Sequence, residues 1–178
     1  MLIGLMGRAG AGKDEVARVL AQEYWYARIA YADALKRALL HVNPLVGDEH
    51  LAALVRVHGF DFVKRTRPEV RRLLQEMGGA MRGVDPDIWT RPVERYIATG
   101  PSRIVVTDVR YPNEAAQIRA LGGVLWRVER PEAGLQGSLA DHESETLLRD
   151  YPADRTILND GTLADLKGAV VAAHDAAR

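Results

Sequence analysis

Apolar residues along the chain form short continuous runs that alternate with segments of helical spacing. The first run, Leu2–Met6, is short and unbroken, as in a buried strand, and it ends in a loop rich in glycine. After the loop, apolar side chains recur at intervals of three and four residues, at Val16, Val19, Leu20 and Tyr24. The pattern predicts a strand, a glycine loop and a helix in that order.

The rest of the chain continues this alternation. Further strands are predicted at 27–31, 103–108, 124–128 and 156–158. Helical spacing predicts helices that carry Leu35, Leu39 and Leu40; Leu51, Leu54 and Val55; Val70, Leu73, Leu74, Met77 and Met81; residues 113–121; and Leu163, Leu166 and Val170 inward. Strands that alternate with helices predict an α/β fold with a parallel, doubly wound sheet, whose site lies at the carboxyl ends of the strands.

Two local signals concern helix ends. Asp85-Pro86 is typical of an N-cap followed by proline at the first helical position, so a helix is predicted to begin there. Gly78 and Gly79 lie beside the apolar stripe of the preceding helix, at a cost of roughly 1 kcal/mol each relative to alanine. They indicate either the end of that helix or the close approach of a ligand to its backbone.

Composition narrows the class of protein. The 178 residues fit one domain, and 47% of them are hydrophobic, which is ordinary for a folded protein. Lys plus Arg equals Asp plus Glu at 24 each, so no overall field favours nucleic acid or membrane. There is no cysteine, which excludes disulfides and a thiol nucleophile, and Leu2–Met6 is too short to span a bilayer. A cytoplasmic protein is expected.

The most specific motif is the glycine loop itself, which matches G-x-x-x-x-G-K between a predicted strand and a predicted helix. It consists of Gly7, Arg8, Ala9, Gly10, Ala11, Gly12, Lys13 and Asp14. Glycines allow backbone N–H groups to surround phosphate oxygens, and the helix N-terminus adds partial positive charge. Lys13 would bridge the β- and γ-phosphates of a nucleotide.

Asp14 departs from the general motif, which has Ser or Thr as a Mg²⁺ ligand at this position. A carboxylate is also a hard oxygen ligand, so Asp14 is a candidate for binding Mg²⁺ directly or through water. The alternative is that its charge only stabilises the positive end of the helix.

Charged residues follow two other predicted strands. Asp108 is placed to order Mg²⁺-bound water or to contact the acceptor, and Arg110 to clamp a phosphate with its planar guanidinium; the alternative for Asp108 is a turn cap. Arg127 and Arg130 close the next predicted strand and open an irregular stretch, and the segment 130–150 is predicted to form a lid. The alternative is that both arginines are solvated surface residues. Trp89 either stacks on a base or packs in a core.

Taken together, these residues make the chain resemble the phage-type deoxynucleoside monophosphate kinases of the P-loop kinase superfamily. The resemblance runs nearly end to end and includes the GKD ending of the loop. It rests on segments 7–14, 32–36, 71–79 with 87–89, 107–114, 122–131 with 142–145, and 158–162.

The resemblance implies a single kinase domain over residues 1–178, with sheet order 2-3-1-4-5 and a helical acceptor-binding region at 32–99. Asn159 and Gly161, within 159–162, would lie beside the adenine of ATP. The residues placed at the acceptor nucleotide are Lys36, Arg71, Arg72, Gly79, Trp89, Asp108, Arg110 and Glu114.

The implied reaction is attack by the 5′-phosphate of a deoxynucleoside monophosphate on the γ-phosphorus of MgATP. The nucleophile is already anionic, so catalysis would rest on positioning and on charge neutralisation by Lys13, Arg110 and Arg130, with Asp108 near the metal. Alternatives are another small-molecule kinase on this core, of the dephospho-coenzyme A or phosphomevalonate type, and a P-loop NTPase or binding module without kinase activity. A homodimer is left open.

Overall fold

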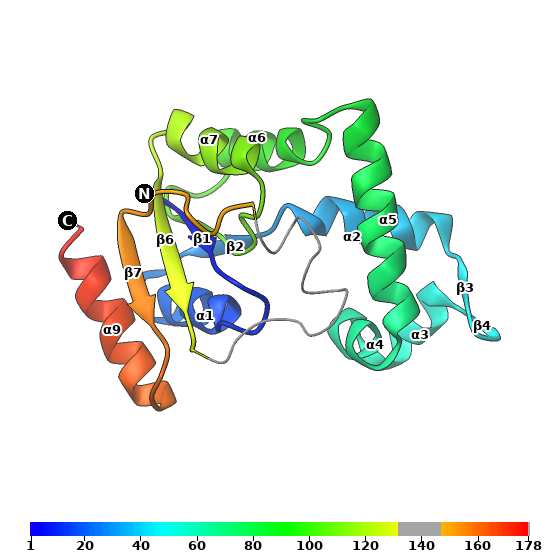
Figure 1. Ribbon diagram of the computed structural model, residues 1–178, viewed down its shortest axis with the longest axis horizontal. Helices are drawn as coiled ribbons and strands as arrows, with labels where there is room; N and C mark the ends of the chain where they lie inside the picture. The colour runs from blue at the N-terminus through cyan, green and yellow to red at the C-terminus, as the bar shows by residue number, and fades with distance from the viewer. Residues whose placement is uncertain (132–146, 178) are drawn as a thin grey trace. The chain divides into compact units, whose positions relative to one another are not determined.

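Five strands of the chain form a parallel sheet (Figure 1). The computed structural model describes residues 1–131 and 147–177. The strands are β1 (Leu2–Met6), β2 (Ala27–Ile29), β5 (Ile104–Val106), β6 (Val124–Glu129) and β7 (Arg155–Leu158). They lie in the order β2-β5-β1-β6-β7, which is 2-3-1-4-5 when these strands are numbered along the chain. The predicted fold class and strand order are confirmed.

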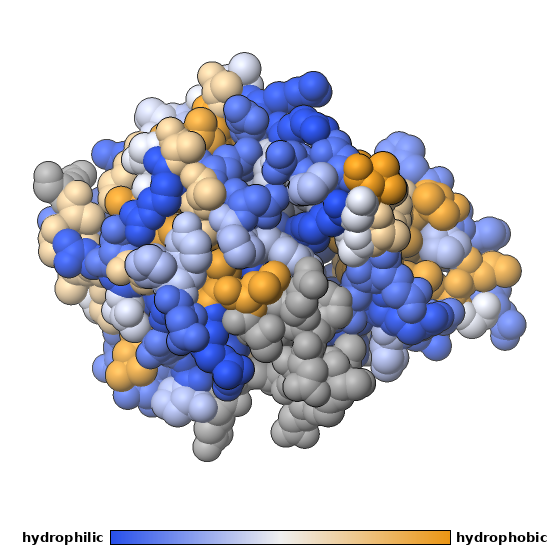
Figure 2. Space-filling view, turned by 45° about the horizontal axis from the view of Figure 1, so that its top comes forward, coloured by the Kyte–Doolittle hydropathy of each residue, from blue (hydrophilic) through white to orange (hydrophobic). Residues whose placement is uncertain are grey.

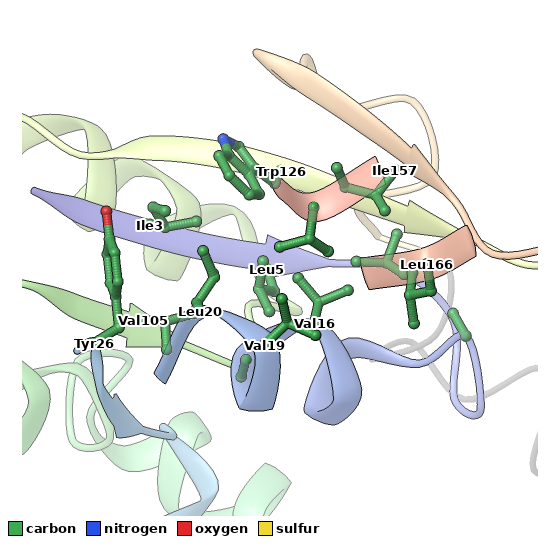
Figure 3. Close-up of a cluster of buried hydrophobic side chains, with 14 residues drawn as sticks. Ile3, Leu5, Val16, Val19, Leu20, Tyr26, Val105, Trp126, Ile157 and Leu166 are labelled. Atoms are coloured by element: carbon green, nitrogen blue, oxygen red, sulfur yellow. The ribbon is translucent and has the colours of Figure 1, made fainter. Parts of the chain in front are cut away.

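Side chains of β1 alternate between the two faces of the sheet. Ile3 and Leu5 pack with α1 (Lys13–Tyr24) and α9 (Leu163–Asp175) in a buried apolar cluster (Figure 3). Gly4 faces α7 (Pro112–Ala120), and a Cβ there would lie only 3.1 Å from the side chain of Ile118. The sheet is therefore covered on both faces, and β1 delivers the glycine loop at its carboxyl end.

The chain divides into two compact units, of which Met1–Ala30 with Val93–Arg178 contains the sheet. The second unit, Tyr31–Pro92, has its own buried apolar cluster, which includes Leu39, Leu51 and Val70. Its elements are α2 (Ala32–Val42), β3 (Leu45–Val46), β4 (Glu49–His50), α3 (Leu51–His58), α4 (Phe60–Thr66) and α5 (Pro68–Val84), and α6 (Thr90–Thr99) begins at its end.

Several local expectations need correction. The region expected to be helical from residue 32 contains an antiparallel hairpin of β3 and β4. The helix expected to begin at Asp85-Pro86 begins at Thr90, because Asp85 instead ends α5 and its carboxylate accepts a hydrogen bond from the Asp87 N–H (3.2 Å) and binds Arg91. Leu163, expected to point inward, is 67% exposed.

Gly78 and Gly79 lie inside α5, so they do not end a helix. Gly78 is buried, and a Cβ there would lie 3.1 Å from the side chain of Leu35 on α2. Its carbonyl accepts a hydrogen bond from Nε1 of Trp89 at 3.2 Å. The space around Gly79 is open within 4 Å. Gly78 is therefore explained by close helix packing within the second unit.

On the face drawn in Figure 2, apolar residues form separate small patches in a mostly hydrophilic surface. No helix in the described part of the chain is both long enough and apolar enough to cross a membrane.

Candidate active site

The glycine loop curls between β1 and α1 because three of its glycines have backbone conformations that L-residues rarely adopt. Gly7, Gly10 and Gly12 have φ values of 139°, 77° and 102°. A Cβ at Gly7 would lie 2.2 Å from the carbonyl oxygen of Val128 on β6. The loop is thus packed directly against the neighbouring strand, which fixes its position at the carboxyl end of the sheet.

The side chain of Lys13 bends back onto this loop. Its side chain is 8% exposed, and Nζ donates hydrogen bonds to the carbonyl oxygens of Gly7 (2.6 Å) and Arg8 (2.8 Å). No side chain caps the N-terminus of α1, whose first backbone N–H groups have no partner within the helix. The loop therefore offers a buried ammonium group and a helix N-terminus to an anion.

Asp14 follows Lys13 but extends away from the core. Its side chain is 85% exposed, and Oδ1 lies 3.5 Å from Nη2 of Arg28. Within residues 1–131 and 147–177, no three acidic or histidine side chains gather into a metal site. Asp14 offers a single carboxylate. One carboxylate is enough for Mg²⁺ where substrate phosphates and water supply the other ligands.

A cavity of about 300 Å³ opens beside the loop, within the unit that contains the sheet. Among the residues that the structure describes, five arginines contribute to its wall against one acidic side chain, Glu129. Because the whole chain has no net charge, this concentration of positive charge is local and indicates an anionic ligand. The lining residues are Gly7, Arg8, Ala11, Val109, Arg110, Arg127, Val128, Glu129, Arg130, Pro131, Leu148, Arg149 and Leu158.

Arg127 binds the backbone at residues 148–151. Its guanidinium donates to the carbonyl oxygen of Leu148 through both Nη atoms at 3.2 Å, and to that of Tyr151 at 2.5 Å. These hydrogen bonds hold Arg149, between the two carbonyls, at the cavity wall. The sequence had singled out Arg127 but not Arg149. The proposed lid lies mostly at 132–146, outside the described residues.

Arg110 and Asp108 follow β5, where the sequence placed them. Both side chains are half-buried, and Arg110 lines the cavity. The backbone N–H groups of Arg110 and Tyr111 donate to Oε2 of Glu114, at 2.8 and 3.1 Å. Glu114 is 1% exposed. Its expected contact with the acceptor stays a prediction, but in the structure its carboxylate holds the turn that carries Arg110.

The candidate acceptor residues from the second unit have contacts of their own. Lys36 Nζ lies 3.8 Å from Oδ1 of Asp61 and 5.4 Å from the ring centre of Phe60. Arg72 pairs with Glu76 one turn along α5, and Arg71 is half-buried on the same helix. Trp89 is buried, with 5% exposed, and its ring N–H is bonded to Gly78, so the structure favours the core role over an open stacking surface.

Asn159 and Gly161 follow β7. Nδ2 of Asn159 donates to the carbonyl oxygen of Ala11 in the glycine loop at 2.9 Å. Gly161 leaves room for the carboxylate of Asp165, because a Cβ at Gly161 would lie 2.7 Å from it. That carboxylate accepts a hydrogen bond from the N–H of Thr162 at the start of α9. Of the predicted site residues, the structure thus gathers Gly7, Arg8 and Ala11 of the loop with Arg110 and Arg130 at one cavity, and Asn159 is bonded to the loop.

Comparison with known proteins decides the family. The family model for deoxynucleotide monophosphate kinases matches residues 48–170, which is more than half of the chain. The chain belongs to this family. It is therefore a nucleotide monophosphate kinase, an enzyme that transfers a phosphoryl group.

Two viral proteins are similar along most of the chain. One, from Acanthamoeba polyphaga mimivirus, is provisionally described as a deoxynucleotide monophosphate kinase and is 27% identical, covering 98% of this chain and 96% of the relative. The other, the uncharacterized protein ORF77 of Ictalurid herpesvirus 1 (strain Auburn), is 29% identical over 94% of this chain and 68% of the relative.

Solved structures share the fold of this kinase at low sequence identity. TT1252 from Thermus thermophilus has a TM-score of 0.54 and 21% identity, covering 100% of this chain and 98% of its own. The dephospho-CoA kinase from Campylobacter jejuni has a TM-score of 0.53 and 15% identity, covering 98% and 95%. At these identities the likeness establishes the fold alone.

Proposed function

We propose that this kinase transfers the γ-phosphoryl group of ATP to the 5′-phosphate of deoxynucleoside monophosphates, which gives the diphosphates. The observation that carries the proposal is the arginine-lined cavity beside a G-x-x-x-x-G-K loop, in a chain of the deoxynucleotide monophosphate kinase family. Two anionic substrates meet in such a reaction, so the site needs more positive charge than a single nucleotide requires.

The loop fits the phosphates of ATP. Gly7 has no room for a side chain, because a Cβ there would collide with the backbone of Val128, and α1 begins at the end of the loop without a side-chain cap. On binding, the ammonium group of Lys13 exchanges the carbonyl oxygens of Gly7 and Arg8 for phosphate oxygens. That exchange aims a buried positive charge at the group being transferred.

The arginines neutralise the negative charge that accumulates when the two phosphates come together. Arg110 would contact the acceptor phosphate, and Arg130 the transferred group. Arg127 would not touch substrate, because its guanidinium already binds the carbonyls of Leu148 and Tyr151. The attacking phosphate oxygen is already anionic, so no residue needs to remove its proton.

Mg²⁺, when bound, would neutralise and orient the β- and γ-phosphate oxygens. Asp14 and Asp108 are the carboxylates of this chain proposed to hold the ion or its water ligands. Of these, Asp14 is the more accessible, at 85% side-chain exposure.

The base and sugar of the acceptor are assigned to the second unit, through Lys36, Arg71, Arg72 and Gly79. The open space around Gly79 on α5 supports a contact there. We further propose that the enzyme acts in the cytoplasm, where ATP and free nucleotides are available, and that its partners are small molecules.

The test is a panel of acceptors offered one at a time with ATP and Mg²⁺, with products separated by chromatography. The panel holds dAMP, dGMP, dCMP, dTMP, the corresponding ribonucleotides, dephospho-coenzyme A and phosphomevalonate. The proposal expects a diphosphate product from at least one deoxynucleotide, and the panel then gives the base and sugar preference. Product only from a non-nucleotide acceptor would overturn the substrate class and keep the fold.

A further inference from the structure

Asn159 makes the hydrogen bond that joins the end of β7 to the glycine loop. Its Nδ2 donates to the carbonyl oxygen of Ala11 at 2.9 Å, across 148 positions of the chain. Its own backbone N–H donates to the carbonyl oxygen of Glu129 at 2.7 Å, which ties it to the end of β6. The side chain is thus anchored to the sheet on one side and to the loop on the other.

We propose that Asn159 is a positioning residue that holds the glycine loop in its phosphate-binding conformation. The inference rests on the proposed use of ATP. It gives Asn159 a task different from the contact with adenine that the resemblance implied.

The planarity of the peptide bond transmits the effect. The carbonyl of Ala11 and the N–H of Gly12 belong to one trans peptide group, so they point in opposite directions. By holding the Ala11 oxygen, Asn159 turns the Gly12 N–H to the opposite side of the loop. There it lies next to the first N–H groups of α1, which are available to an anion.

Packing makes this arrangement rigid. A Cβ at Gly12 would lie 2.4 Å from Nδ2 of Asn159, so only glycine, at φ 102°, leaves room for the amide. The reverse orientation of the amide would set Oδ1 against a carbonyl oxygen, so the hydrogen bond also fixes which atom faces the loop.

The place of Asn159 relative to the cavity supports an indirect role. Among the described residues, the lining of the cavity includes Leu158 and Ala11 but not Asn159. The amide therefore acts on the loop from behind. Its loss should weaken binding of the phosphates whether or not a nucleoside is attached to them.

Calorimetric titration with ATP and with inorganic tripolyphosphate, both in the presence of Mg²⁺, tests this. The variants are Asn159→Ala and Asn159→Asp, whose carboxylate cannot donate to Ala11. Both ligands should bind about tenfold more weakly to Asn159→Ala, the scale of one lost hydrogen bond, and no better to Asn159→Asp. Hydrogen exchange of the backbone amides at 7–13 should also become faster in both variants.

The matched control is Asn43→Ala. The side chain of Asn43 likewise makes one hydrogen bond to the backbone, accepting the N–H of Ala52 at 2.9 Å in the second unit. This variant should lose stability without losing affinity for tripolyphosphate, which separates positioning of the loop from general destabilisation.

The other outcomes count against the inference. Weaker binding of ATP with unchanged binding of tripolyphosphate would show that Asn159 contacts the nucleoside. Unchanged affinity for both, or a wild-type protein that binds ATP but not tripolyphosphate, would also overturn it. A wild-type protein that binds neither ligand would instead overturn the proposed function, and this inference with it. If one variant fails to fold, the other gives the same comparison.

Discussion

At the scale of single residues, the shape of the glycine loop depends on contacts with residues outside its sequence motif. Gly7 is set by the carbonyl of Val128 and Gly12 by the amide of Asn159. Lys13 is held inside the loop by two of its carbonyl oxygens. The same lysine that the proposal assigns to phosphate thus stabilises the loop through these hydrogen bonds, and its role can be tested by substitution.

Lys13→Ala should lower kcat by about a hundredfold or more, because a buried charge that stabilises the transferred group is lost. Steady-state turnover with a deoxynucleotide acceptor measures this. The matched control is Lys167→Ala, an exposed lysine on α9 whose Nζ pairs with Glu23 at 2.7 Å. Equal activity of the two variants would contradict the role of Lys13.

Two arginines of the same cavity should behave differently. Arg127→Met leaves the carbonyls of Leu148 and Tyr151 without their donor, so it should lower the free energy of unfolding by about 1–3 kcal/mol and raise KM. Arg130 makes no hydrogen bond to the described residues, so Arg130→Met should lower kcat with little effect on stability. Denaturant unfolding and kinetics on both variants check this; equal loss of stability would refute the distinction.

At the scale of elements, long apolar patterns predicted the strands and helices well, and short polar signals did not. The β3–β4 hairpin was missed because each strand has only two residues and no alternation to detect. Asp85-Pro86 carried a helix-start signal, but the carboxylate is used by Asp87 and Arg91 in a turn. Which backbone group a polar side chain caps depends on its neighbours in space, and a local pattern does not contain them.

The turn between β5 and α7 provides an element-scale prediction. Glu114→Ala removes the acceptor for the N–H groups of Arg110 and Tyr111, and should lower stability by about 1–3 kcal/mol and raise KM for the acceptor. Glu114→Gln keeps an acceptor oxygen, so its stability and its KM for the acceptor should stay close to those of the wild type. Unfolding curves and kinetics would show this; if Gln is as damaging to kcat as Ala in a stable protein, the charge itself touches substrate.

At the scale of the whole molecule, the distribution of charge matters more than its sum. A chain with no net charge places five arginines of its described part around one cavity. The sequence identified those near motifs, such as Arg110 and Arg130. It missed Arg149, and it could not reveal that Asn159 reaches Ala11, because neither follows from local spacing. The loop, the sheet order and the family were within reach of the sequence, whereas long-range contacts needed the fold.

The stability of the fold should also depend on pH, through Asp154. Burial raises the pKa of Asp154, but hydrogen bonds from Arg119 and the Leu125 N–H outweigh it, so the pKa is held below its usual value. A lowered carboxyl pKa adds stability above the unfolded value, 3.8, and that stability is lost as pH falls through the folded pKa.

Because the side chain of Asp154 is 37% exposed, the charge-dependent part should be below about 1 kcal/mol. Asp154→Asn should therefore lower the unfolding midpoint at pH 7, and the gap from wild type should shrink towards pH 3. Thermal melts across that range measure it, and a gap that stays constant would contradict the assignment.

The path of the γ-phosphoryl group tests the proposed reaction most directly. ATP labelled at the γ-phosphate is incubated with the wild-type enzyme, Mg²⁺ and each deoxynucleoside monophosphate. We expect the label to appear in a deoxynucleoside diphosphate, and Lys13→Ala to suppress this transfer. Label released only as inorganic phosphate, whichever acceptor is present, would contradict it and identify an NTPase.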